Sequence, residues 1–121
     1  MSFGRPYILD IDGCIHDGWL VIQNYQEAYD MQFLYYILGS NSVIEQYIAM
    51  AAGSSVKNLN KEKVANVILK APKSLIEQRA IADILSNMDK ELTELEIKRT
   101  KYQALKQGMM QQLLTGKIRL I

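Results

Sequence analysis

Residues 74–114 carry the clearest hydrophobic pattern in the chain. These forty-one positions contain no proline and one glycine, Gly108, and many of them are strong helix formers. Apolar or semi-apolar residues recur every seven positions with companion residues beside them, which is typical of a coiled-coil seam. We therefore predict one long helix here, or two nearly continuous ones. The predicted seam consists of Ile81, Leu85, Met88, Leu92, Leu95, Tyr102, Leu105 and Met109.

In the first half of the seam, a second apolar row lies four positions after the seven-residue row, at Leu85 and Leu92. This spacing does not continue into the second half, where it would pass through Arg99 and Lys106. At 1.5 Å per residue the predicted helix would be roughly 60 Å long, about twice the diameter of a small domain. The helix could pack along its own domain, but a small globule has too little surface to cover such a stripe. We expect the seam to meet a partner outside the globule.

The part of the chain before this helix mixes strand-like and helix-like patterns. Short β-rich runs separated by Asp-Gly turns predict two or three strands within residues 5–22. Residues at helical spacing predict a helix over 27–38, and a second helix is expected over 43–52. Asn60 is the expected N-cap of a short helical turn, and residues 66–70 predict a further strand.

Together these elements predict an α+β fold. Residues 1–72 would form a small domain of short strands and two or three helices, and residues 73–121 would form the long helix and a C-terminal tail. Hydrophobic residues make up 49% of the chain and charged residues 22%, which indicates an ordered protein. Cys14 is the only cysteine, so it excludes an internal disulfide and a cysteine-based zinc site, and it indicates a reducing compartment. The sequence shows neither a signal peptide nor a membrane-spanning run, so we expect a cytoplasmic protein.

The net charge of +1 hides an uneven distribution along the chain. Residues 1–56 hold one basic and six acidic groups, whereas residues 57–121 hold thirteen basic and seven acidic groups. A polyanionic partner would have to meet the second part. Around residue 57, where the chain changes from mainly acidic to mainly basic, small residues lie beside Lys and Asn side chains. These side chains can bind phosphates and base edges, although the same stretch could be a solvated loop. The candidate DNA-binding residues are Ser54, Ser55, Lys57, Asn58 and Lys61.

Residues 8–18 resemble the first motif of haloacid-dehalogenase-type phosphatases, in which a strand delivers a nucleophilic Asp and, two residues later, an acid/base Asp. Asp10 and Asp12 would take these roles. That chemistry also needs a hydroxyl residue, a lysine and a downstream acidic pair for Mg²⁺, because two carboxylates cannot neutralise a transferring phosphoryl group. Asp83 and Asp89 lie on the predicted long helix and do not supply that pair. Two Asp-Gly turns between strands are the simpler interpretation.

The sequence contains no motif for other catalytic or cofactor chemistry. His16 is the only histidine, so neither a Ser/His/Asp triad nor a histidine-rich zinc site can be assembled with confidence. The glycine patterns that bind nucleotide phosphates do not occur. We therefore expect no catalytic residues, no metal and no cofactor.

From about Tyr29 onward the chain resembles the specificity subunits of type I restriction-modification systems. The motifs that carry the resemblance are GSSVKNLN at 53–60, VILKAP at 67–72, EQRAIADIL at 77–85 and QQLLTGKIRL at 111–120. Residues 13–20 also fit the variable domain of that family. The pattern is similar to the end of a target-recognition domain that runs into a conserved long helix.

The resemblance implies a non-catalytic role in DNA specificity. In that family each target-recognition domain reads one half of a bipartite double-stranded DNA site, and the long helices pair antiparallel and dock the methyltransferase subunits. Methyl transfer belongs to the modification subunit and cleavage to the restriction subunit. A half-subunit of the family is longer than this chain, so part of the recognition domain would lie ahead of Met1. We predict an antiparallel homodimer through the seam. The alternative is a helical interaction module that binds partner subunits without touching DNA.

Overall fold

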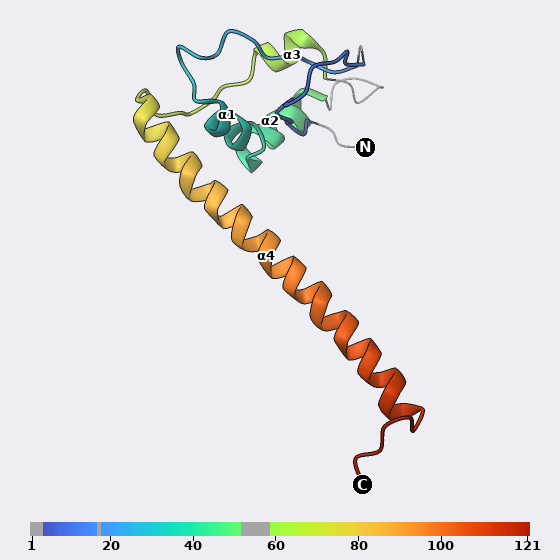
Figure 1. The fold of residues 1–121 in the computed structure, drawn as a ribbon. Coiled ribbons are helices and arrows are strands. Elements are labelled where there is room, and N and C mark those ends of the chain that lie inside the picture. The colour runs from blue at the N-terminus through green and yellow to red at the C-terminus, as the bar shows by residue number, and fades with distance from the viewer. Residues whose placement is uncertain (1–3, 17, 52–58) are drawn as a thin grey trace. The chain divides into compact units, whose positions relative to one another are not determined.

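The computed structural model describes residues 4–16, 18–51 and 59–121. Helices within these ranges occur in the order α1 (Met31–Leu38), α2 (Asn41–Ala51), α3 (Lys61–Ala65) and α4 (Leu75–Leu114), as labelled in Figure 1. The chain divides into two compact units, Met1–Asp83 and Ile84–Ile121. We call them the core unit and the helical unit. The domain boundary expected after residue 72 stays a prediction.

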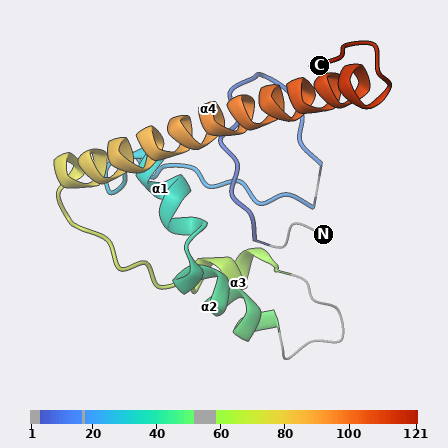
Figure 2. The same ribbon diagram turned by 90° about the horizontal axis from the view of Figure 1, so that it is seen from below.

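The hydrophobic core lies between α1 and α2, which follow one another closely, while α3 lies beside α2 (Figure 2). Leu34 and Leu38 are one helical turn apart on α1, and Val43 and Tyr47 have the same spacing on α2. This spacing places each pair on one helix face, so the two faces pack together. Partly buried residues complete the cluster: Tyr25, Tyr29, Ile37, Leu59, Val64, Val67 and Leu69.

Among the four buried members of this cluster, Tyr47 carries the polar group, and it is only 4% exposed. Burial raises the pKa of its phenol above the ordinary value of 10.0, because the charged phenolate would lose its hydration. The ring also lies against the backbone near Gly4, where a Cβ atom would approach Tyr47 Cδ2 to 2.6 Å. Gly4 has a φ of +67°, so both the space and the backbone favour glycine there.

The predicted α+β fold is wrong for the part of the chain that the structure describes, since that part contains helices and no strand. The strands expected within residues 5–22 and 66–70 have no ladder partner. A β-rich sequence forms a strand only when a neighbouring strand accepts and donates its backbone hydrogen bonds. Here the Trp19 N–H instead donates to His16 O at 3.0 Å, which closes a local turn.

At Ile68 a side chain takes the place of the missing neighbouring strand. The Ile68 N–H donates to Gln46 Oε1 at 2.9 Å, and Gln46 Nε2 donates to Ile68 O at 3.1 Å. A single amide from α2 therefore satisfies both backbone groups that a strand would pair. This contact occupies both backbone hydrogen-bonding groups of Ile68, so neither is left for a neighbouring strand.

The short helices agree with the sequence in position and differ in their ends. Helix α1 begins at Met31, later than the predicted Glu27, because residues 25–29 form a turn in which Tyr29 N–H donates to Tyr25 O at 2.8 Å. Helix α2 begins two residues before the predicted Val43. The prediction that Asn60 caps the next helix is confirmed, since its Oδ1 accepts from Lys63 N–H at 2.9 Å.

The predicted long helix is confirmed as a single uninterrupted helix of 40 residues, α4 (Figure 1). Ser74 precedes it, and its Oγ accepts from the Glu77 N–H at 3.4 Å. The helix ends before Gly116, which has a φ of +72° and donates its N–H to Leu113 O at 3.2 Å. No helix among the described residues is both long and apolar enough to cross a bilayer.

Candidate nucleic-acid and subunit interfaces

The side chain of Gln78 forms a set of hydrogen bonds inside the core unit, where it is fully buried at 0% exposure. Its Nε2 donates to Ala28 O at 3.0 Å and to Pro72 O at 2.8 Å, and its Oε1 accepts from Asp30 N–H at 2.8 Å. One side chain at the start of α4 thus satisfies three backbone groups from two other segments. We call this set of contacts the Gln78 clasp.

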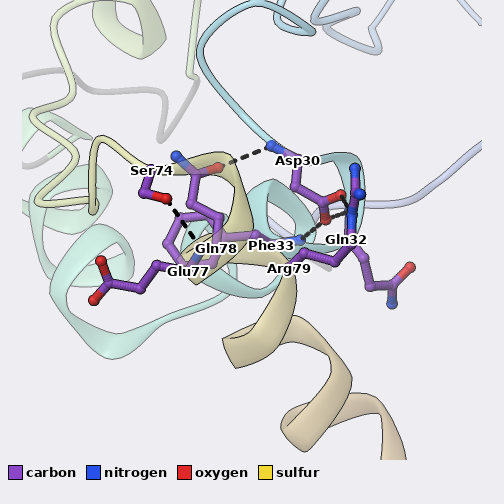
Figure 3. Close-up of polar contacts among 7 residues, drawn as sticks. All are labelled: Asp30, Gln32, Phe33, Ser74, Glu77, Gln78 and Arg79. Carbon is purple, nitrogen blue, oxygen red and sulfur yellow. Dashed lines mark hydrogen bonds and ion pairs between the residues drawn. The ribbon is translucent and has the colours of Figure 1, made fainter.

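Asp30 extends the clasp on the side of α1 (Figure 3). Its Oδ1 accepts from the Gln32 and Phe33 N–H groups at 3.0 and 3.1 Å, which makes it the N-cap of α1. Its Oδ2 lies 3.5 Å from Arg79 Nε, and the Arg79 side chain is 69% exposed. The cap and the clasp together join the start of α1 to the start of α4 within the core unit.

Neither Gln78 nor Asp30 was predicted from the sequence as a functional or structural site. A signal was present for Asp30, which directly precedes an apolar helical run. Gln78 stands between Glu77 and Arg79, so nothing in the local sequence marks it as a buried residue. Ala82 is also buried, at 1% exposure. The first two turns of α4 are therefore part of the core unit, and they include the EQRAIADIL motif only as far as Asp83.

Of the candidate DNA-binding residues, Ser54, Ser55, Lys57 and Asn58 lie outside the described residues. Lys61 is described, and it is exposed at the first position of α3. The carboxamide oxygen of the neighbouring Asn60 is engaged by the Lys63 N–H. Lys61 is therefore free of the capping arrangement and open to solvent, and its role in DNA binding stays a prediction.

The predicted seam residues lie along α4 with very different environments at its two ends. Ile81 and Leu85 are partly buried. The other six residues of the seam are between 43% and 60% exposed: Met88, Leu92, Leu95, Tyr102, Leu105 and Met109. A row of half-exposed apolar side chains at coiled-coil spacing is the surface that a partner helix would cover.

The charges of α4 and the tail separate into two blocks. Residues 83–96 hold five acidic groups and one basic group, Lys90, whereas residues 97–121 hold six basic groups and no acidic group. The basic block consists of Lys98, Arg99, Lys101, Lys106, Lys117 and Arg119. Positive charge in the second part of the chain therefore gathers at the end of the helix as well as around residues 57–63.

The carboxylates considered for phosphatase chemistry do not come together with a downstream acidic pair. Asp10 and Asp12 are exposed on either side of a bend at Ile11, outside any helix, and Asp83 and Asp89 lie on α4 as expected. His16 Nδ1 accepts from the Gly18 N–H at 3.0 Å. Among the described residues, no group of three or more His, Cys, Asp and Glu side chains is placed to hold a metal ion.

Comparison with known proteins gives one family match. The model for the type I restriction modification DNA specificity domain matches residues 2–107 of the chain. No solved structure matches the chain. The family match spans both the core unit and most of α4.

Proposed function

The chain belongs to the type I restriction modification DNA specificity domain family, and we propose that it acts as a non-catalytic DNA-specificity subunit, or part of one, in a type I restriction-modification system. The observation that carries this proposal is the family match over residues 2–107. The long helix α4 fits the coiled-coil element that the resemblance implies. Reaction chemistry would belong to the other subunits of the system.

We propose that double-stranded DNA is bound through the stretch around residues 54–61. Lys57 and Lys61 would neutralise phosphates, while Ser54, Ser55 and Asn58 would supply donors to phosphates or base edges. The exposure of Lys61 supports its part in this surface. The charge distribution also supports it, because the acidic groups predominate before residue 57 and the basic groups after it.

The proposed protein partners are methyltransferase subunits, through them the restriction subunits, and a second copy of this chain. The half-exposed apolar row of α4 supports the pairing of two copies, since burial of that row would remove a large apolar area from water. We propose that residues 1–72 serve recognition and residues 73–121 serve assembly, in the cytoplasm.

The test of DNA binding is a titration of duplex DNA with the chain and its methyltransferase subunits at several salt concentrations. Replacing Lys57 and Lys61 together by Ala should weaken binding and lower the slope of log affinity against log salt by about 2, because two fewer counterions are released. The control is Lys90→Ala, which removes a lysine from the acidic block of α4. A slope that is the same in the double variant and in the control would remove these lysines from the interface.

The second candidate function is an interaction module that binds partner subunits without touching DNA. The exposed apolar row of α4 favours it, because that row suits protein contact better than phosphate contact. A pull-down with methyltransferase subunits beside a gel shift on duplex DNA separates the two functions. Retention of the subunits without any shift of DNA would support the interaction module and contradict the proposed DNA contact.

A further inference from the structure

One row of side chains on α4 changes from apolar to basic within the helical unit. The row contains Leu85, Leu92, Arg99 and Lys106, which follow one another at seven positions and therefore lie on nearly the same face. Burying an arginine or lysine side chain without an anionic partner is costly. The second half of this row therefore suits water or an anion, and it does not suit an apolar helix.

Arg99 and Lys106 belong to the basic block, in which every charged side chain has the same sign. Residues 97–121 contain no Asp and no Glu. All six basic side chains of the block are exposed, and none of them forms an ion pair within the part of the chain that the structure describes. Their positive charge is therefore available to a partner.

The end of α4 accounts for only part of this charge. The Ile118 N–H donates to Gln112 O at 3.1 Å, so the tail folds back and keeps Lys117 and Arg119 beside the last turn. The free carbonyl groups there carry partial negative charge, which favours cations within about one turn. Arg99 and Lys106 lie more than two turns before the end of the helix at Leu114, so this effect does not explain them.

The phosphate backbone of a duplex matches the basic block in charge density. The four basic residues of the block that lie on α4 fall between Lys98 and Lys106, which spans about 12 Å of helix. Duplex DNA carries one negative charge per roughly 1.7 Å of its axis, so the same length presents about seven phosphates. Residues 84–121 contain seven basic and four acidic side chains. Pairing of two copies would therefore still leave positive charge for a polyanion.

We propose that the basic block is a second DNA-binding surface, which contacts duplex phosphates irrespective of base sequence. The inference rests on the DNA binding proposed above and adds a contact on the helical unit, in a different part of the sequence from residues 54–61. Arg99 and Lys106 form its centre, about 10 Å apart along the helix. Phosphate contacts carry no base information, so this surface adds affinity for any duplex.

Titration of a random-sequence duplex with the full chain at several salt concentrations tests this surface, with fluorescence anisotropy as the readout. Arg99→Gln together with Lys106→Gln should lower the slope of log affinity against log salt by about 2 and weaken binding roughly 60-fold near 0.1 M salt, because each lost phosphate contact releases about 0.9 fewer counterions. Glutamine is a good helix former, so α4 should stay helical by circular dichroism. Arg99→Lys together with Lys106→Arg keeps both charges and should keep the slope.

The matched control is Lys73→Gln together with Lys90→Gln, which removes the same charge from two exposed lysines outside the block. The control should leave the slope unchanged, and an equal fall in both variants would overturn the proposal because the effect would then reflect net charge alone. An unchanged slope in the Arg99 and Lys106 variant, or no binding of the random duplex by the full chain, would also overturn it. Loss of methyltransferase capture with unchanged duplex binding would assign the block to an acidic protein surface instead.

Failure of this surface and failure of the contact at residues 54–61 are read from different variants. The Lys57 and Lys61 variant is titrated on the same duplex beside the Arg99 and Lys106 variant. Two independent phosphate contacts predict that the losses of slope add when the four substitutions are combined. A fall in the Lys57 and Lys61 variant alone would retain the proposed DNA contact and contradict the second surface.

Discussion

The α1–α2 core of the core unit and the predicted seam of the helical unit place their apolar side chains in opposite environments. In the core unit, Val43 and Tyr47 are 1% and 4% exposed, and they pack against α1 of the same chain. In the helical unit, Leu92 and Leu95 are 58% and 60% exposed. Removing apolar surface from water would be favourable in either unit. The difference is the reason we propose that the core unit gains its stability within one chain and the helical unit by association.

Polar groups differ between the two units in the same way. The core unit buries a complete amide, Gln78, and satisfies each of its bonds with backbone groups. No side chain of the helical unit is fully buried among the described residues. Changes that act inside the core unit should therefore alter folding, and changes along the seam should alter pairing.

The largest expected effect is the loss of pairing when the seam is charged. Replacing Leu92 and Leu95 together by Glu should weaken the dimer by at least about 1,000-fold, which corresponds to roughly 4 kcal/mol, because apolar contacts are lost and carboxylates would have to be buried. The control is Thr93→Glu with Ile97→Glu, which adds the same charge on the opposite face of α4. Sedimentation measures both. Equal dimer affinity in the two variants would contradict the seam.

The next effect concerns the Gln78 clasp. Gln78→Ala leaves the Asp30 N–H and the Ala28 and Pro72 carbonyls without their partner, so it should destabilise the core unit by about 3 kcal/mol or more. Hydrogen exchange of the α1 and α2 amides measures this loss within the core unit. Gln107→Ala, on an exposed part of α4, is the control and should change the exchange by less than about 0.5 kcal/mol. Equal exchange in the two variants would show that the clasp does not stabilise the unit.

A smaller effect is expected at the cap of α1. Asp30→Ala removes the acceptor of the Gln32 and Phe33 N–H groups and should destabilise the core unit by about 1 kcal/mol. Asp30→Asn keeps an acceptor and should recover most of this loss. Arg79→Ala should cost less than about 0.5 kcal/mol, since the Arg79–Asp30 ion pair is largely solvated. An Arg79→Ala effect as large as that of Asp30→Ala would assign the stability to the ion pair instead of the cap.

The smallest effect is a pH dependence at Tyr47. Burial raises the pKa of its phenol above 10.0 in the folded chain, so the unfolded chain loses this proton first. The contribution of Tyr47 is therefore constant below about pH 9, and stability falls as the pH rises above the unfolded pKa and through the folded one. Tyr47→Phe should remove this part of the alkaline decline in urea unfolding experiments, and the difference between the two curves isolates the phenol. Parallel curves from pH 8 to 11 would contradict the prediction.

The parts of the fold that depend on local sequence were predictable. Helix α4 is predicted by forty residues that are rich in helix formers and carry apolar residues at coiled-coil spacing. The start of α3 is predicted by Asn60, whose side chain can cap a helix. The expected strands were wrong because a strand depends on a distant partner, which no local pattern supplies. At Ile68 the partner was a glutamine side chain 22 positions earlier.

The candidate interfaces were predictable to different degrees. The exposed apolar row of α4 followed from periodicity, because a helix projects every seventh residue on nearly the same face, and its use as a seam stays a prediction. The role of Gln78 did not, because its three backbone partners come from residues 28, 30 and 72, which only the folded chain brings together. The DNA-binding residues remain a prediction from composition and resemblance, since Lys61 is the one member that lies among the described residues.

Sedimentation equilibrium of the unmodified chain tests most directly whether the helical unit is an association element. Across the micromolar range and at low salt, we predict the mass of two chains. At high salt we predict a shift toward one chain, because salt screens the attraction between the acidic block of one antiparallel helix and the basic block of the other. The mass of a single chain throughout that range would contradict this role and would leave the apolar row of α4 to a different partner.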